Sequence, residues 1–350
     1  MKGAVFTGNR TVELMEFPDP SPGPDEVVIE IKASGMCGSD LKFYRAAPGE
    51  MQRALGLGDV SEPNIAGHEP CGVVVGVGKG VDERQARVGQ RVMDHHYAGC
   101  GACDHCRTGW GQLCGEGITV FGVTGHGAHA PYMKVPVRTL VTLPDELSYS
   151  TGAAIACGTG TAYGAIRRMN LSGHDTLAVF GQGPVGLSAT QLGAAMGARV
   201  IALDTNAERR GLAEKMGASA VIDPTTDDAV EALMELTDGR GVDLALDCSS
   251  AEAARVAAVK ATRTWGTVCY VGEGGNVTLD VSSDMIRRQI TLIGSWTFST
   301  VIQAECARFV AERGIDVDGL FTDHYTLDQV DEAYKKFDTQ STGKGVFLFG

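Results

Sequence analysis

Long apolar runs and an excess of basic residues are both missing from this sequence. No stretch reaches the roughly 18 uninterrupted apolar residues that a membrane-spanning helix requires. Lys and Arg number 30 against 43 Asp and Glu, which gives a net charge of −13. An acidic chain repels polyphosphate backbones and anionic lipid surfaces. We therefore expect no membrane and no nucleic acid among the partners of this protein.

Low-complexity segments and a recognisable export signal are also missing. The composition, with 43% hydrophobic and 21% charged residues, is that of a globular chain, and 350 residues are enough for two domains. The early apolar run Ala4–Phe6 is shorter than the core of a signal peptide, so we expect a cytoplasmic protein. In such a chain, ten cysteines favour metal binding over disulfides.

The local pattern changes near Thr176. Before it, short β-like runs such as Val27–Ile31 and Gly72–Val77 alternate with turn residues, which predicts an irregular β domain. After it, apolar runs alternate with helical periodicity, which predicts parallel strands and crossover helices. The expected strands are Leu177–Phe180, Val200–Leu203, Ala220–Ile222, Leu244–Asp247 and Val268–Val271. The tail, with helical patterns at 306–310 and 327–337 and a strand at 345–349, is assigned to neither domain by its pattern.

Four cysteines lie close together in the segment CGACDHCRTGWGQLC. They are Cys100, Cys103, Cys106 and Cys114. Four thiolates at this spacing can close a tetrahedral shell around Zn²⁺, and a closed shell indicates a structural site. Disulfides, a redox pair or an iron–sulfur cluster are the alternatives, although the last spacing does not suit common cluster patterns. His105 lies inside the loop and is interpreted as a surface residue, because four thiolates already saturate the metal.

A second candidate metal set is scattered along the chain. It consists of Cys37 in GMCGSD, His68 in AGHEP and Cys157 in IACGTG. Two thiolates, one imidazole and an open fourth position are typical of catalytic zinc. Glu69 is either a further, transient ligand or a surface carboxylate, and Asp40 is a candidate to hydrogen-bond the ligand imidazole.

A glycine-rich segment, GQGPVG, follows the expected strand that ends at Phe180 and precedes a helical run. Its candidate cofactor-binding residues are Gly181, Gly183, Pro184, Val185 and Gly186. Asp204 follows Gly183 by 21 residues at the end of the next expected strand, where a carboxylate can bind the adenosine ribose. The context predicts a dinucleotide site with NAD favoured over NADP, because Asp204 repels a 2′-phosphate. A packing turn without a ligand is the alternative.

Together these motifs resemble the zinc-containing medium-chain alcohol dehydrogenases over essentially the whole chain. The triplet Gly67–Glu69, the four-cysteine segment, Gly181–Gly186 and Asp204 occur in the order and approximate spacing of that family. The resemblance implies an α/β protein with a GroES-like β-rich catalytic domain and a doubly wound parallel-sheet Rossmann domain. The implied boundaries are 1–155 and 296–350 for the GroES-like domain, and 156–295 for the NAD-binding domain.

The resemblance also assigns residue roles. Cys37, His68 and Cys157 fall on the family's catalytic zinc ligands, and Ser39 falls on the residue that passes the alcohol proton onward. Many members carry a His five residues after the first zinc Cys, where this chain has Lys42. The resemblance therefore leaves two proton routes, one through Lys42 and one through ribose hydroxyls and water.

Further cofactor contacts follow from the same resemblance. Arg209 stands where the family places a basic residue near the adenosine ribose, and the backbone around Val271 and Ser295 matches segments that contact the nicotinamide carboxamide. Trp296 and Phe298 are interpreted either as lining of the substrate pocket or as plain core.

The implied activity is reversible oxidation of a primary or secondary alcohol to an aldehyde or ketone, with NAD as hydride acceptor and zinc in catalytic and structural roles. A polyol or threonine-type dehydrogenase is the alternative within the family, although Cys157 stands where polyol enzymes tend to have Glu. An inactive, zinc-bearing structural homologue and a zinc-independent reductase are further alternatives. The family forms homodimers and homotetramers, and the segment 45–63 is expected to be a helical lid or an interface element.

Overall fold

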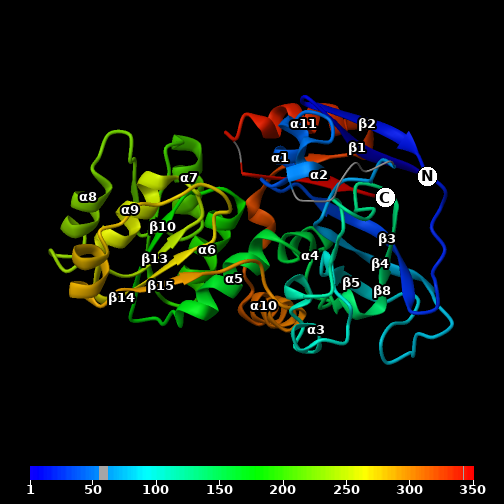
Figure 1. Cartoon of the computed structure of the whole chain (residues 1–350), viewed down its shortest axis with the longest axis horizontal. Helices are drawn as coiled ribbons and strands as arrows, with labels where there is room; N and C mark the ends of the chain where they lie inside the picture. The colour runs from blue at the N-terminus through cyan, green and yellow to red at the C-terminus, as the bar shows by residue number, and fades with distance from the viewer. Residues whose placement is uncertain (55–61, 342) are drawn as a thin grey trace. The chain divides into compact units, whose positions relative to one another are not determined.

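The computed structural model describes residues 1–54, 62–341 and 343–350. The chain divides into two compact units, and Figure 1 labels many of their helices and strands. Unit 1 comprises residues 1–160, 298–340 and 344–350, and unit 2 comprises residues 161–297 and 341–343. Helix α5 (Gly158–Met169) starts in unit 1 and continues in unit 2.

Unit 1 is built on a mixed sheet. Among the described residues, this sheet has seven strands in the order β16-β17-β3-β4-β5-β9, with β8 paired to β3 outside that path. Its strands are β3 (Glu26–Gly35), β4 (Pro70–Val77), β5 (Arg91–Asp94), β8 (Tyr132–Pro136), β9 (Leu140–Thr142), β16 (Phe321–Tyr325) and β17 (Lys344–Leu348). Two separate two-stranded antiparallel sheets accompany this sheet, β1 (Lys2–Gly8) with β2 (Thr11–Glu16) and β6 (Tyr97–Ala98) with β7 (Thr119–Val120). Alternate residues of β3, namely Val27, Ile29 and Ile31, enter one core cluster, as the two-residue period of a strand requires.

Short helices connect these strands. They are α1 (Asp40–Arg45), α2 (Glu50–Ala54), α3 (Asp104–Arg107), α4 (Tyr149–Ile155), α10 (Thr300–Arg313) and α11 (Val330–Asp338), with 3-10 turns at Gly111–Leu113, Val137–Thr139, Val317–Leu320 and Leu327–Gln329. The Ser148 and Ser299 side chains accept backbone hydrogen bonds at the starts of α4 and α10. Of the expected lid segment 45–63, the described part includes α2, and residues 55–61 lie outside the described residues.

Unit 2 is a doubly wound α/β unit. Its strands are β10 (Thr176–Phe180), β11 (Arg199–Leu203), β12 (Ala220–Ile222), β13 (Val242–Asp247), β14 (Thr262–Tyr270) and β15 (Thr291–Gly294), and its helices are α6 (Pro184–Ala195), α7 (Ala207–Lys215), α8 (Ala229–Glu235) and α9 (Glu252–Ala261), with turns at Val281–Met285 and Ile286–Arg288. All strand pairs are parallel, in the order β12-β11-β10-β13-β14-β15. The chain order reverses beside β10, and ligands of such sheets bind at the carboxyl ends of the strands at that point.

In unit 2, β14 and β15 differ most from the sequence expectation. β15 was not among the expected strands, because it is a short edge strand with largely exposed side chains and so lacks a buried strand's burial pattern. β14 begins at Thr262, six residues before the expected start, in a stretch interrupted by the exposed Trp265. Within the described residues, no helix is long and apolar enough to cross a membrane.

Candidate active site and metal centres

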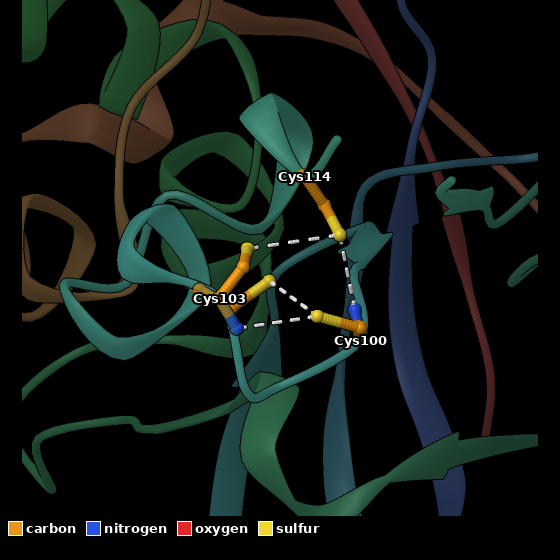
Figure 2. Close-up of side chains that lie close together, drawn as sticks. Cys100, Cys103 and Cys114 are labelled. Carbon is orange, nitrogen blue, oxygen red and sulfur yellow. Dashed lines mark hydrogen bonds between the residues drawn. The ribbon is translucent and has the colours of Figure 1, made fainter. Parts of the chain in front are cut away.

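The four clustered cysteines lie in one lobe of unit 1. Figure 2 shows the sulfur atoms of Cys100, Cys103 and Cys114 turned toward one another. The Sγ atoms of Cys100 and Cys106 are 3.9 Å apart, as are those of Cys103 and Cys114. A disulfide needs about 2.05 Å. A tetrahedron of zinc–sulfur bonds of about 2.3 Å has sulfur–sulfur edges of roughly 3.8 Å, so the lobe fits a zinc ion and not a disulfide pair.

Backbone N–H groups of the loop stabilise a thiolate, the form of cysteine that binds a metal cation. The N–H groups of Ala102 and Cys103 donate to the sulfur of Cys100, and they lower the pKa of this thiol to about 6. Desolvation instead raises the pKa of Cys106 to about 12, with neighbouring thiols acting in the same direction. A bound cation would hold all four groups as thiolates. His105 is exposed and stands outside the ligand cluster, in line with its interpretation as a surface residue.

The scattered second set comes together elsewhere in unit 1. Cys37, His68, Glu69 and Cys157 each offer a ligand atom, and these atoms all lie within 4.8 Å of one another. Cys37 follows β3, the His68–Glu69 pair precedes β4, and Cys157 follows α4. The sulfur atoms of Cys37 and Cys157 are 3.7 Å apart, again close to one edge of a zinc tetrahedron.

Asp40 fixes the imidazole of His68. Its Oδ1 lies 2.9 Å from His68 Nδ1, and its Oδ2 accepts a hydrogen bond of 2.9 Å from the backbone N–H of Cys37. Burial opposes the charged imidazole, but Asp40 and Cys37 together raise the pKa of His68 well above its ordinary value. With Nδ1–H held by Asp40, the Nε2 atom is the one available to a metal ion.

Glu69 is fully buried, so its interpretation as a surface carboxylate is wrong. Its Oε2 lies 2.5 Å from Nζ of Lys344, which is also buried and donates to the carbonyl oxygen of Met36 at 3.0 Å. Among the described residues, Glu69 Oε1 has no hydrogen-bond partner. Burial raises the pKa of Glu69 to about 8, although Lys344 acts in the opposite direction. A buried carboxylate oxygen without a hydrogen-bond partner, such as Glu69 Oε1, is suited to bind a cation at this site.

Sequence reasoning missed Lys344 and His96. Lys344 begins an apolar final strand, and nothing in that pattern marks it as the partner of a carboxylate. His96 is buried with its ring centroid 5.0 Å from that of His68, and its Nδ1–H donates to the carbonyl oxygen of Ala156 at 3.1 Å. Burial holds the pKa of His96 well below its ordinary value, so the ring is neutral. The adjacent histidines His95–His96, directly after β5, were the available signal.

The other side chains that the sequence singled out differ in how exposed they are. Ser39 is half-buried, with Oγ 3.2 Å from Cys37 Sγ and 3.1 Å from His68 Nε2. Lys42 lies on the exposed side of α1. Phe298 is fully buried and its carbonyl oxygen accepts bonds from His95 and Gln112, which supports the core interpretation, whereas Trp296 is 41% exposed.

The glycines of the Gly181–Gly186 loop serve different needs. Gly181 has a φ of +87°, which favours glycine, and a Cβ on Gly186 would lie 1.7 Å from the carbonyl oxygen of Gly181. A Cβ on Gly183 would meet no described atom within 4 Å. Gly183 immediately precedes Pro184 at the N-terminus of α6. The fold therefore accounts for Gly181 and Gly186, whereas Gly183 leaves open space at a helix N-terminus, where a phosphate group binds favourably.

Asp204 is buried at the end of β11 and faces this loop. Its Oδ2 accepts a bond of 2.6 Å from the N–H of Gln182, and its Oδ1 accepts from Asn206. Arg209 lies on α7, where burial lowers the pKa of its guanidinium while nearby Asp204 opposes that shift. Arg210, which the sequence did not single out, donates to the carbonyl oxygen of Asp204 at 2.8 Å.

Val271 and Ser295 follow neighbouring parallel strands. The N–H of Val271 donates to Asp247, and the N–H of Ser295 donates to Tyr270. Both residues therefore lie beyond the carboxyl ends of β14 and β15, the same edge of the sheet that carries the glycine loop after β10.

Two family models match the chain. The alcohol dehydrogenase GroES-like domain matches residues 23–145, and the zinc-binding dehydrogenase model matches residues 184–312. Among curated proteins, the zinc-type alcohol dehydrogenase-like protein YphC of Escherichia coli is 39% identical, over 100% of this chain and 99% of its own length. The sorbitol dehydrogenase of Bacillus subtilis is 32% identical (96% and 93%), and the L-threonine 3-dehydrogenase of Pyrococcus horikoshii is 33% identical (96% and 94%).

Solved structures agree with these matches. The alcohol dehydrogenase TADH from Thermus sp. ATN1 has a TM-score of 0.89 at 26% identity, covering 99% of each chain. The acetophenone reductase of Geotrichum candidum in complex with NAD has a TM-score of 0.82 at 28% identity (99% and 97%). A zinc-binding dehydrogenase of Sinorhizobium meliloti bound to NADP has a TM-score of 0.85 at 25% identity (99% of each).

The fold and the comparisons define an α/β oxidoreductase with a GroES-like unit and a Rossmann-like unit. This confirms the fold class expected from the sequence. The chain belongs to the zinc-type alcohol dehydrogenase family.

Proposed function

We propose that the protein is a zinc-dependent dehydrogenase that oxidises a primary or secondary alcohol to an aldehyde or ketone, with NAD as the hydride acceptor. The observation that carries the proposal is the convergence of Cys37, His68 and Cys157, with the Ser39 hydroxyl 3.2 Å from the sulfur of Cys37. Two thiolates and one imidazole contributed by separate segments are typical of a catalytic zinc site, whereas the four-cysteine lobe is a closed, structural one.

Each residue of the catalytic set has a defined task. Cys37, His68 and Cys157 would hold the zinc ion, and Asp40 keeps the Nδ1–H tautomer of His68. A zinc ion bound there supplies Lewis-acid chemistry that favours loss of the proton from a substrate hydroxyl. Ser39 receives that proton and passes it outward. Lys42 stays a candidate for the outer end of this route, because it lies on the exposed side of α1, the helix that begins directly after Ser39.

Ser39→Ala is expected to lower kcat about 10²-fold or more, because a positioned proton-transfer group contributes about that much. The side chain is half-buried and the change is small, so zinc content and thermal stability should stay at their wild-type values. Steady-state kinetics with NADH absorbance measures the loss. Lys42→Ala is a matched variant on the same helix: an altered pH profile would place Lys42 in the route, and an unchanged one would remove it.

NAD rather than NADP is expected as the cofactor. Asp204 lies at the end of β11 beside the glycine loop, and its carboxylate would face the dianionic 2′-phosphate of NADP. Arg209 and Arg210 offset part of that repulsion, so we expect a preference and not an absolute exclusion. The ratio of kcat/KM for the two cofactors should favour NAD in the wild type and fall at least tenfold in Asp204→Ser. Equal use of both cofactors by the wild type would contradict this prediction.

A polyol or amino-alcohol is the second candidate substrate class. Sorbitol and L-threonine 3-dehydrogenases are among the relatives, and buried, neutral His96 offers a polar group close to His68. Cys157 favours the simple-alcohol class, because polyol enzymes of the family tend to have Glu at that position.

A substrate panel with NAD tests the proposal. Primary alcohols, secondary alcohols, polyols and threonine are each assayed for NADH formation, with and without a zinc chelator. We expect turnover with at least one class and loss of that turnover with the chelator. No turnover with any class would favour an inactive structural homologue, and turnover insensitive to complete zinc removal would favour a zinc-independent reductase. Cytoplasmic location and assembly into a homodimer or homotetramer stay predictions.

A further inference from the structure

We propose that Tyr334 and His129 are positioning residues for the candidate zinc ligand His68. They extend the Asp40–His68 pair into a buried hydrogen-bonded chain, so that the C-terminal helix α11 controls how firmly the metal is held. The inference rests on the proposed function, because it assumes that His68 binds zinc.

The chain of contacts is continuous. Ser34 Oγ lies 2.7 Å from His129 Nδ1, and His129 Nε2 lies 2.7 Å from the hydroxyl of Tyr334. That hydroxyl lies 3.1 Å from Asp40 Oδ2, and Asp40 Oδ1 lies 2.9 Å from His68 Nδ1. The residues come from β3, the loop before β8, α11, α1 and the segment before β4, all in unit 1.

The donors and acceptors allow one direction along this chain. An ionised carboxylate only accepts, so the Tyr334 hydroxyl donates its single proton to Asp40. The oxygen of Tyr334 must then accept from His129 Nε2–H, which leaves His129 Nδ1 to accept from the hydroxyl of Ser34. A neutral ring is required for this, and burial lowers the pKa of His129 to about 4. Every bond therefore points toward Asp40.

The chain is shielded from water and tightly packed. Ser34, His129 and Tyr334 are fully buried, and Asp40 is 3% exposed. Gly67, next to His68, has a φ of +90°, and a Cβ there would lie 2.3 Å from His129 Nδ1. The glycine of the GHE triplet is thus needed partly because the His129 ring lies against it.

The hydrogen-bonded chain affects the metal site through the orientation of the Asp40 carboxylate. Its Oδ2 receives two bonds, one from the N–H of Cys37 and one from Tyr334, and together they hold the carboxylate in the orientation that meets His68. Without the Tyr334 hydroxyl, the carboxylate loses one donor and His129 loses its acceptor in a dry environment. The His68 ring is then less firmly oriented for zinc, since partners of this kind set metal affinity.

Tyr334→Phe tests the inference in the full-length, zinc-loaded protein. Release of zinc to a chromogenic chelator is followed over time. The folded Cys37→Ser protein, which is expected to keep only the zinc of the cysteine lobe, identifies the phase of that lobe, and the remaining phase belongs to the catalytic site. We expect Tyr334→Phe to release the catalytic zinc about 3- to 10-fold faster, below the 10- to 100-fold typical of a direct partner of a ligand. The phase of the cysteine lobe should not change, and kcat should fall while KM for NAD stays constant.

Tyr44→Phe is the matched control. Tyr44 is equally buried, and its ring centroid lies 5.5 Å from that of Tyr334 in the same core cluster. The structure shows no hydrogen bond from the Tyr44 side chain to Ser34, His129, Tyr334, Asp40 or His68. Removal of the Tyr44 hydroxyl should therefore leave zinc release at the wild-type rate. If Tyr334→Phe is not obtained folded, Ser34→Ala carries the test, with an expected acceleration of about 2- to 3-fold.

The outcomes separate the inference from the proposed function. Two zinc ions in the wild type, with catalytic release from the folded variant no faster than from Tyr44→Phe, would overturn the inference alone. A wild-type protein that holds only the zinc of the cysteine lobe would overturn the proposed function, and the positioning role with it.

Discussion

Cys37→Ser is expected to abolish most activity while the protein still folds. Cys37 supplies one of two thiolates of the catalytic set, and its backbone N–H also holds Asp40, which a Ser at this position preserves. Loss of the zinc ion removes several kcal/mol of charge stabilisation, and at about 1.4 kcal/mol per tenfold this corresponds to a drop in kcat of roughly 10³-fold or more. Metal analysis should show zinc falling from about two equivalents to about one.

Cys71→Ser is the matched control for this variant. Cys71 is a buried thiol on β4 of the same unit, and burial raises the pKa of this thiol far above its ordinary value. It belongs to neither ligand set, so its replacement should change stability modestly and leave zinc content unchanged. Soluble Cys37→Ser protein with normal turnover would show that the catalytic assignment is wrong.

Cys103→Ser is expected to damage folding far more than chemistry. No hydrophobic residue between Ala98 and Phe121 is buried, and the cysteine sulfurs of the lobe are instead spaced like the corners of a tetrahedron. The binding free energy of a structural zinc, about 10–16 kcal/mol in isolated zinc-finger peptides, contributes directly to folding stability. We expect a drop in Tm of many degrees, or insoluble protein, with any soluble fraction lacking one zinc equivalent.

His105→Ala is the control inside the same loop. His105 is exposed and outside the ligand cluster, so Tm and zinc content should match the wild type. Thermal unfolding followed by circular dichroism, together with metal analysis, measures both variants. A Cys103→Ser protein as stable as His105→Ala would show that the lobe does not depend on metal.

Local spacing in the sequence was sufficient for the cysteine lobe, because all four ligands lie within 15 residues of one loop. Likewise the alternation after Thr176 predicted five of the strands in the parallel sheet. The sequence did not predict β15, because an exposed edge strand lacks the apolar pattern of a buried strand. For the scattered set, Cys37, His68 and Cys157 were grouped by residue type and by family resemblance, since nothing in their spacing shows that they meet.

The sequence by itself determined the family, the α/β class, the cysteine lobe and the glycine loop with Asp204, because each depends on short-range spacing or a local period. Only the tertiary structure decided that Glu69 is buried against Lys344, that His96 lies beside His68, and that Tyr334 reaches Asp40. These partners are separated by up to 294 residues in the chain. Burial and hydrogen-bond direction depend on which distant segments pack together, and no local pattern carries that information.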